Sequence, residues 1–290
     1  MMIGFTEIQN EIMITGGFEG QTVIDVPDEI EDARVTSVNT YAFADRTDIR
    51  EVILPKSMTH IGAHAFYNCR NLALIELHDG IRDIDDGAFK NCYRLEKIIM
   101  HSHDGREGCI RNLMDDNTQE LSLEIHYDDG QSSLLTFPVF EDDYVENTPA
   151  RIFQAVSYGT GGAYRQCMQS GSIDYREFDE LFPRSVRADR FQAALNNSIG
   201  RLSHPYRLFN SAKEIYARFL KDNAEKAAIF LMEKGDVDSI KTMCSVSAFD
   251  KDEIDRLLDA AAQNDLPEAV GILMNYRTEH FKIHRRNYEL

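Results

Sequence analysis

Apolar residues recur at a fixed interval along the first hundred or so positions of the chain, while the polar residues between them vary. The clearest copies are MTHIGAHAFYNC, which begins at Met58, and IRDIDDGAFKNC, which begins at Ile81. A fixed period in the twenties is typical of a solenoid, because one short unit cannot bury its apolar face alone and must stack on its neighbours. The pattern therefore predicts a stack of coils.

Several aligned columns define the repeat, and the members of each column are expected to stack inside the coil. The columns are Val35, Met58 and Ile81; Val38, Ile61 and Ile84; Ala42, Ala65 and Ala88; Phe43, Phe66 and Phe89; Ile49, Leu72 and Leu95; Val52, Ile75 and Ile98; Leu54, Leu77 and Met100; and the pairs Asn68-Cys69 and Asn91-Cys92. Both cysteines are interpreted as small buried apolar residues.

Each repeat also contains a short stretch such as LALIELH, in which apolar and polar residues alternate as they do in a strand. This alternation predicts that Ile75 and Leu77 point into the coil. One outward face then carries apolar residues among charged ones, which is typical of a protein-recognition surface. The alternative is that outward isoleucine and leucine reflect only β-propensity. The candidate partner-binding residues are Glu51, Ile53, Leu74, Glu76, Lys97 and Ile99.

The columns resemble the BspA-type leucine-rich repeat, whose units follow approximately L-x-x-I-x-I-P-x-S-V-x-x-I-G-x-x-A-F-x-x-C. The segment ILPKSMTHIGAHAFYNC, which starts at Ile53, reproduces almost every position, although Arg46 stands where later units carry cysteine. The resemblance covers about the first hundred residues and implies a leucine-rich-repeat solenoid. Members of this family are often exported surface proteins, so an exported surface or host-binding protein is one alternative function.

After residue 101 the period stops, and LSLEIHYDDGQSSLLTFPVF alternates on both sides of Asp129-Gly130. This pattern predicts a β-hairpin. Because an open solenoid end exposes apolar side chains and unpaired strand groups, we expect the hairpin to cap the coil. The chain is predicted to become helical after the acidic stretch FEDDYVENTPA.

Three capping-box patterns mark predicted helix starts in the remaining sequence: Ser211 with Glu214, Asp250 with Glu253, and Asp265 with Glu268. An apolar spacing of three and four predicts the buried faces of these helices. The expected buried residues are Ile215, Phe219, Leu231, Met232, Ile240, Met243, Ile254, Leu257, Leu258, Ala261, Val270 and Leu273.

A weaker second repeat aligns Val237 with Leu266 and Ile240 with Ala269, and it resembles degenerate ankyrin-type helix pairs. The predicted fold class is α+β: a short leucine-rich-repeat β-solenoid with a capping β-hairpin, followed by an all-α, ankyrin-like helical-repeat domain. The predicted domains are residues 1–105 for the solenoid, 106–145 for the hairpin cap or linker, and 146–290 for the helical repeats.

The charge balance limits the classes of partner that the chain is expected to bind. With 49 acidic and 31 basic residues, the net charge of −18 repels phosphate backbones and anionic lipid head groups, so neither nucleic acid nor a membrane is expected as a partner. No run of 18 apolar residues and no secretory signal pattern is present, which favours the cytoplasm. The odd number of cysteines, five, favours free thiols.

One loop, HSHDGREGC, gathers His101, His103, Asp104 and Cys109, which are residue types that bind zinc. Their spacing matches no recognised zinc motif. The sequence therefore predicts no metal, no cofactor and no catalytic residue. A ligand- or metal-binding protein with a site at the interdomain junction, near His101, His103 and Cys109, is the alternative.

Three other segments have weaker signals. The glycines of SYGTGGAYRQ could free backbone amides for a phosphate, but the segment lacks the G-K-[ST] ending, so a helix-breaking turn is favoured. Cys167 and Cys244 lie in segments of apolar periodicity, where burial makes a thiol unreactive. The basic C-terminal run HFKIHRRNYEL is interpreted as a solvated tail, with pairing to an acidic surface as the alternative.

Taken together, these patterns predict a non-enzymatic protein–protein interaction module, either a scaffold or an adaptor. It would use the outward strand face, the helical repeats or both. The expected partner is a protein, and its identity and the oligomeric state of the chain are left open by the sequence.

Overall fold

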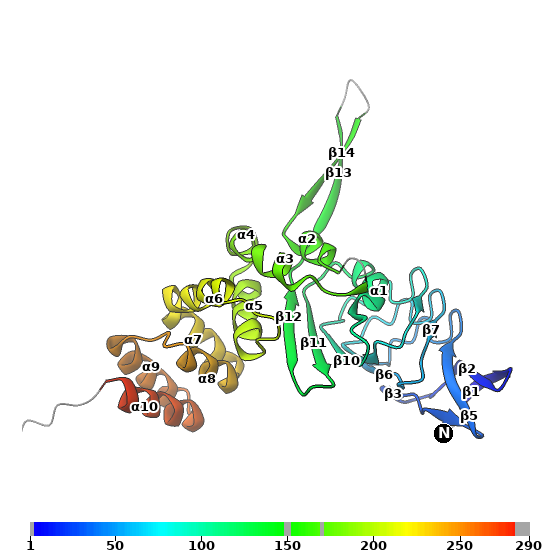
Figure 1. Cartoon of the computed structure of the whole chain (residues 1–290), viewed down its shortest axis with the longest axis horizontal. Coiled ribbons are helices and arrows are strands. Elements are labelled where there is room, and N and C mark those ends of the chain that lie inside the picture. The colour runs from blue at the N-terminus through cyan, green and yellow to red at the C-terminus, as the bar shows by residue number, and fades with distance from the viewer. Residues whose placement is uncertain (1–2, 148–151, 169–170, 282–290) are drawn as a thin grey trace, which may run out of the picture. The chain divides into compact units, whose positions relative to one another are not determined.

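The computed structural model of the chain describes residues 3–147, 152–168 and 171–281 (Figure 1). The chain divides into two compact units, the first of which ends at Ala194. The N-terminal part is a β-solenoid of about five turns, and the region that follows it is helical, with ten α-helices in the described residues. The predicted order of solenoid and helices is therefore confirmed. The predicted boundaries at residues 105 and 145 stay predictions.

Each regular coil of the solenoid contributes one strand to each of two six-stranded sheets. The strands of the first sheet are β1 (Ile3–Ile8), β2 (Glu11–Gly17), β4 (Glu29–Ile30), β5 (Ala33–Val38), β7 (His60–Ile61) and β9 (Asp83–Ile84). The strands of the second are β3 (Val23–Asp25), β6 (Glu51–Ile53), β8 (Leu74–His78), β10 (Lys97–Ser102), β11 (Leu121–Tyr127) and β12 (Ser132–Phe137). Parallel pairing from β3 through β11 stacks the successive coils strand on strand.

The predicted columns form the core of the solenoid. Every apolar column member is buried except Ala42 of the first coil, which is partly exposed. The Phe43 and Phe66 rings stack with their centroids 5.1 Å apart, and Phe66 and Phe89 repeat that spacing. Phe18 extends the column by one ring, 6.1 Å from Phe43. The sequence repeat thus encodes a continuous ladder of aromatic rings, because each ring packs on its copy in the next coil.

Two positions in each turn require a left-handed backbone. The first is occupied by Tyr41, His64 and Gly87, and the second by Asp45, Asn68 and Asn91, all with φ between 56° and 67°. Asparagine, aspartate and glycine adopt this region more readily than other residues. The repeated asparagine that precedes Cys69 and Cys92 is therefore explained by its backbone conformation.

The last regular coil is closed by a side chain. The amide of Phe66 donates to the carbonyl of Ala88 in the next coil at 2.8 Å. No further regular turn follows that of Phe89, so its amide donates instead to Oδ2 of Asp116 at 3.2 Å. Asp116 follows two short helical elements, η1 (Glu107–Ile110) and α1 (Arg111–Asp115). This segment replaces the turn of the next coil and satisfies one of the donors that the open end would leave unpaired.

The predicted hairpin is confirmed as β11 and β12, which pair antiparallel around a turn where Gly130 has a φ of 80°. β11 also pairs parallel to β10, so the hairpin continues the second sheet. A second antiparallel pair, β13 (Glu141–Asn147) and β14 (Ile152–Tyr158), comes before most of the helices. The prediction of helix directly after the acidic stretch is therefore wrong. Ile152 to Tyr158 is rich in the aromatic and β-branched residues that favour strands.

A buried arginine holds the segments that follow the solenoid. Arg165, on α2 (Gly161–Gln166), is 2% exposed and lies 4.8 Å from the centre of the Phe140 ring. Burial lowers its pKa to about 10. Its guanidinium donates to five backbone carbonyls at 2.8–3.1 Å, those of Met114, Asn117, Gln119, Pro138 and Gly161. One side chain thus connects α1, the start of β11, the end of β12 and α2.

The remaining helices are α3 (Tyr175–Glu180), α4 (Phe182–Ala188), α5 (Phe191–Ser203), α6 (Asn210–Asp222), α7 (Ala224–Lys234), α8 (Val237–Ser245), α9 (Lys251–Gln263) and α10 (Pro267–His280). The capping box of Asp250 and Glu253 is confirmed at the start of α9. Ser211 lies inside α6, and Asp265 precedes the residue that caps α10, so these two predicted capping boxes are wrong. Pro267 at the first turn of α10 fixes that helix start without a side-chain cap.

The predicted apolar faces of these helices are largely buried, but Leu258 and Val270 are partly exposed and Ile215 is 42% exposed. The prediction for Ile215 is wrong because the buried face of α6 follows Ala212, Tyr216, Phe219 and Leu220. None of the described helices combines the length and the apolar content needed to cross a bilayer.

Candidate functional site

Strand alternation places the six predicted residues on one side of the second sheet. Val52, Ile75 and Ile98 are fully buried on the opposite side. Of the predicted residues, Glu51 is exposed, and the others are partly exposed: Ile53, Leu74, Glu76, Lys97 and Ile99. The predicted inward and outward directions are therefore confirmed, while a binding role for these residues stays a prediction.

The register between the strands arranges these residues as a checkerboard. Each apolar residue has a charged residue directly opposite it on a neighbouring strand, so no two of the three apolar side chains are directly paired. The register pairs are Glu51 with Leu74, Ile53 with Glu76, Leu74 with Lys97, and Glu76 with Ile99. Apolar and charged groups therefore alternate in both directions of the sheet.

The checkerboard extends beyond the residues predicted from the sequence. β3 adds Val23 and Asp25 on one side, and β11 adds Ser122 and Glu124 on the other. The intervals from Val23 to Glu51 and from Lys97 to Ser122 are both longer than the regular interval of the repeat, so a search at that interval misses both strands. We define the outward face as Val23, Asp25, Glu51, Ile53, Leu74, Glu76, Lys97, Ile99, Ser122 and Glu124.

The outward face is acidic. It carries four carboxylates against the single ammonium of Lys97, a net charge of −3 at neutral pH when histidine is neutral. The Lys97 Nζ lies 2.7 Å from Glu124 Oε2. Partly exposed pairs of this kind contribute little to stability, because solvent screens them. The outward face therefore keeps a net negative charge, which attracts cationic groups.

A buried carboxylate shapes the loop after β10. Asp79 is 1% exposed, and its Oδ2 accepts hydrogen bonds from the backbone amides of His103, Asp104 and Arg106 at 2.7–3.3 Å. The Ser102 hydroxyl donates to the same oxygen at 3.2 Å. Burial acts to raise the pKa of Asp79, but these donors outweigh it and the pKa lies below its ordinary value.

The residues of the metal-binding alternative have separate partners. His101 Nε2 lies 2.8 Å from Glu76 Oε1, and His103 Nδ1 lies 2.7 Å from Asp128 Oδ1. Cys109 belongs to η1, and burial raises the pKa of its thiol to about 12. Among residues 3–147, 152–168 and 171–281, no group of three or more histidine, cysteine, aspartate or glutamate side chains is arranged to hold a metal ion.

The surroundings of the two cysteines in the repeat column make their thiols unreactive. The Cys69 thiol donates to the carbonyl of Phe43 at 3.2 Å, and the Cys92 thiol donates to that of Phe66 at 3.3 Å. Burial raises the pKa of Cys69 to about 12 and raises that of Cys92 further. Because the thiolate is the reactive form, these geometries oppose a nucleophilic role.

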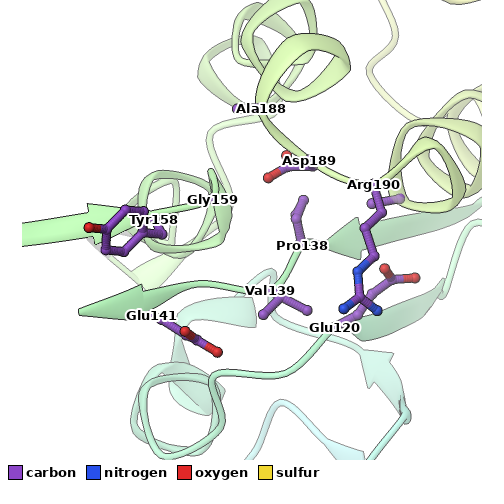
Figure 2. Close-up of a pocket in the computed structure, with 10 residues that line it drawn as sticks. Glu120, Pro138, Val139, Glu141, Tyr158, Gly159, Ala188, Asp189 and Arg190 are labelled. Carbon is purple, nitrogen blue, oxygen red and sulfur yellow. The ribbon is translucent and has the colours of Figure 1, made fainter. Parts of the chain in front are cut away.

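A small pocket lies at the base of β13 and β14 (Figure 2). Its volume is about 140 Å³, below the roughly 300–1,000 Å³ of typical small-molecule sites. Asp189 on its wall accepts hydrogen bonds from the amide and the hydroxyl of Thr160. The lining residues come from Glu120 to Ala193 and do not include the residues of the metal-binding alternative.

The glycine-rich segment next to this pocket serves close packing. A Cβ at Gly161 would lie 1.9 Å from the carbonyl oxygen of Pro138, and one at Gly159, where φ is +80°, would lie 2.3 Å from that of Val139. The predicted turn fits Gly159, but Gly161 and Gly162 begin α2 and do not break it. Glycine is required here because two backbones approach each other.

The solenoid geometry defines the N-terminal part as a leucine-rich-repeat region. Residues 25–107 match the family model described as BspA type leucine rich repeat region, in six copies. The resemblance seen in the sequence is thereby confirmed for this part of the chain. No protein among the curated ones matches the chain.

Three solved structures are similar to parts of the chain. A T. pallidum leucine rich repeat protein is 33% identical, over 37% of this chain and 53% of that one, with a TM-score of 0.32. A Bacteroides ovatus leucine-rich repeat protein is 25% identical over 35% and 29%, with a TM-score of 0.30. A leucine rich cell surface protein from Faecalibacterium prausnitzii is 20% identical over 38% and 32%, with a TM-score of 0.30. The chain spans about half the length of the T. pallidum protein.

Proposed function

We propose that the chain is a non-enzymatic protein-binding module and that its outward face contacts the partner. Leucine-rich repeats are generally protein–protein interaction modules. The observation that supports this face is the partial exposure of Ile53, Leu74 and Ile99 on three neighbouring strands, each opposite a charged residue. Apolar residues among charges give a partner both contact area and orientation.

The test is a pair of substitutions, Leu74→Lys and Ile99→Lys, in the full chain. Because these positions fill no core, the far-ultraviolet circular dichroism spectrum and the unfolding midpoint should stay unchanged. Proteins captured by the natural chain from its own cell should be lost. A matched control, Tyr41→Lys with Tyr93→Lys, adds the same charge at side chains that are 57% and 64% exposed outside the strands. Equal capture by both double variants would place the binding surface elsewhere.

The helices from α8 to α10 are a second part of the proposal, as an ankyrin-like repeat pair that contributes binding surface. One observation supports the repeat: Ile240 and Ala269, which the offset aligns, are both fully buried. Deleting residues from 237 onward should weaken capture if these helices contact the partner, whereas unchanged capture would restrict binding to the solenoid.

We further propose that the chain works in the cytoplasm or another reducing compartment. The five cysteines are unpaired in the structure, which is consistent with that setting. Mass spectrometry of unreduced protein, alkylated after unfolding, should find five free thiols. A reproducible disulfide between Cys69 and Cys92 would contradict the proposal.

A further inference from the structure

Four of the chain's nine histidines lie together at one end of the outward face. His78 on β8, His101 on β10 and His126 on β11 are directly paired in register. Their rings stack with centroids 4.7 Å and 5.5 Å apart. His103, on the loop after β10, places its ring 5.4 Å from that of His78. We name these four residues the histidine row.

Three members of the row contact a carboxylate. His101 lies against Glu76 at 2.8 Å and His126 against Glu124 at 3.0 Å, so two carboxylates of the outward face are shared with the row. His103 contacts Asp128 in the turn between β11 and β12 at 2.7 Å.

The fourth member, His78, has an imidazole as its hydrogen-bond partner, because its Nδ1 lies 3.2 Å from Nε2 of His103. Burial, followed by repulsion from His101 and His103, lowers the pKa of His78 to about 4. His78 therefore stays neutral in mild acid. Its ring contacts those of both His101 and His103.

Other charged groups face the row from each neighbouring element. Lys56, which precedes β7, acts on His78, and Lys97 of β10 pairs with Glu124. On the loop after β10, the carboxylate of Asp79 is occupied by backbone amides, and Asp104 is paired with Arg106 at 2.6 Å. The groups that surround the row are Lys56, Glu76, Asp79, Lys97, Asp104, Arg106, Glu124 and Asp128.

The row couples the charge of the outward face to pH. With Asp128 included, the carboxylates of the face and Lys97 give a net charge of −4 at neutral pH, and protonation of His101, His103 and His126 reduces it to −1. Histidine is the side chain whose ordinary titration falls between about pH 5 and pH 8. Each proton that one of these three histidines gains makes the charge near Leu74 and Ile99 one unit less negative.

The checkerboard also suits a particular kind of side chain. Lysine and arginine lay their aliphatic stems along apolar surface and keep the charged head near an anion. On the outward face, each apolar residue lies directly across a strand pair from a charged residue, and four of the five charged residues are carboxylates.

We propose that the outward face binds a protein segment with lysine or arginine side chains around an apolar contact, and that protonation of His101, His103 and His126 in mild acid releases it. This inference rests on the proposed function of the same face. Charge complementarity favours a basic partner at neutral pH, and its loss weakens binding at lower pH. Added salt should weaken binding in the same direction, because the contacts are exposed.

The probe is a fluorescein-labelled synthetic peptide of leucine and lysine, compared with a leucine and glutamate peptide of equal length. Fluorescence anisotropy measures the dissociation constant for the full chain at pH 7.5 and pH 5.5, and circular dichroism checks that the fold persists at both. We expect the lysine peptide to bind at pH 7.5 and to bind at least about tenfold more weakly at pH 5.5. We expect no binding of the glutamate peptide.

Matched variants separate the row from general charge effects. The triple change His101→Gln, His103→Gln and His126→Gln keeps polar side chains that cannot be protonated, and it should reduce the pH effect to less than about twofold. The control triple change uses histidines outside the row and should keep the full effect: His60→Gln, His204→Gln and His280→Gln.

The outcomes distinguish this inference from the proposed function. Equal binding of the lysine peptide at both pH values, persistence of the pH effect in the row variant, or unfolding at pH 5.5 overturns release by the row. Failure of the lysine peptide to bind at pH 7.5, or equal binding of the glutamate peptide, overturns the partner chemistry. The last comparison uses the two double variants described above. If the variant with Leu74→Lys and Ile99→Lys binds the lysine peptide as tightly as the control with Tyr41→Lys and Tyr93→Lys, the proposed function of the face fails as well.

Discussion

The solenoid and the C-terminal helices bury their apolar residues in different ways. In the solenoid a side chain packs on its own copy in the next coil, as Phe43, Phe66 and Phe89 do at 5.1 Å. In the helical unit each buried residue meets different neighbours, as Phe249 and Tyr276 do in an edge contact at 5.7 Å. Repetition fixes both the partner and the geometry of a contact, whereas an amphipathic helix fixes only which side is buried.

The largest effect expected from this difference is that of Phe66→Ala. Removing a buried phenylalanine costs about 3–5 kcal/mol of unfolding free energy, and Phe66 stacks on rings in both neighbouring coils. Leu257→Ala in α9 should cost about 2–5 kcal/mol, because Leu257 is also fully buried. Hydrogen exchange of the full chain should show faster exchange across β6, β8 and β10 for the first variant, and in α9 and its neighbouring helices for the second.

Tyr93→Ala is the control in the same repeat, since its side chain is 64% exposed, and it should leave exchange unchanged. If Phe66→Ala accelerates exchange in its own coil alone, the columns do not act as a cooperative stack and the contrast between the two regions is lost.

The segments that follow the solenoid are held neither by contacts between repeat copies nor by an amphipathic helix face. Arg165→Met tests how much the arginine stabilises them. The substitution keeps an apolar side chain of similar length but leaves five backbone carbonyls without the guanidinium. Unpaired buried polar groups cost about 1–3 kcal/mol each, and relaxation and water recover part of this, so we expect a loss of about 3 kcal/mol. Urea unfolding measures it, with Arg176→Met as the exposed control. If Arg165→Met lowers the unfolding free energy no more than Arg176→Met does, packing alone holds the junction.

The sequence predicted the solenoid more completely than the rest, and particular residues show why. The fixed interval of the repeat identified the aromatic column from Phe43 to Phe89, because each copy confirms the others. It missed Phe18, Val23 and Ser122, since the coils that contain them have other lengths and the register there is set by strand pairing. A period search cannot find a member whose offset differs.

Contacts between unlike segments were invisible to the pattern. Arg165 has no motif, because its five partners are backbone carbonyls that any residue supplies. The stacking of His78 on His101 could have been predicted, since both follow the interval of the repeat. His126 lies at the longer offset of β11, so the interval does not reveal it. The predicted capping box at Ser211 failed because α6 begins one residue earlier, at Asn210.

A third prediction concerns acid and the loop held by Asp79. Its folded-state pKa lies below the unfolded-state value of about 3.9, so the ionised carboxylate stabilises the fold above about pH 4, and this contribution is lost as the pH falls through the folded-state pKa. Asp79→Asn should therefore lower the unfolding free energy by about 2 kcal/mol at neutral pH. The difference from the natural chain should shrink below about pH 4, as urea unfolding at several pH values would show.

The control for this prediction is Asp128→Asn, whose side chain is 68% exposed and should contribute little at any pH. If the difference in unfolding free energy between Asp79→Asn and the natural chain stays constant down to pH 3.5, the substitution destabilises the fold through poorer packing. The loss of the negative charge is then not the cause.

The smallest expected effect sharpens the comparison within the helical unit itself. Asp250 accepts from the Glu253 amide at 2.8 Å while the Glu253 side chain accepts from the Asp250 amide, so Asp250→Ala should cost about 1 kcal/mol. Ser211→Ala is the matched control, because Ser211 has the same sequence pattern but lies in the first turn of α6. There alanine replaces serine inside a helix and should be neutral or stabilising by up to about 0.5 kcal/mol. Urea unfolding of the full chain compares the two. Equal losses would mean that Ser211 caps its helix as Asp250 does.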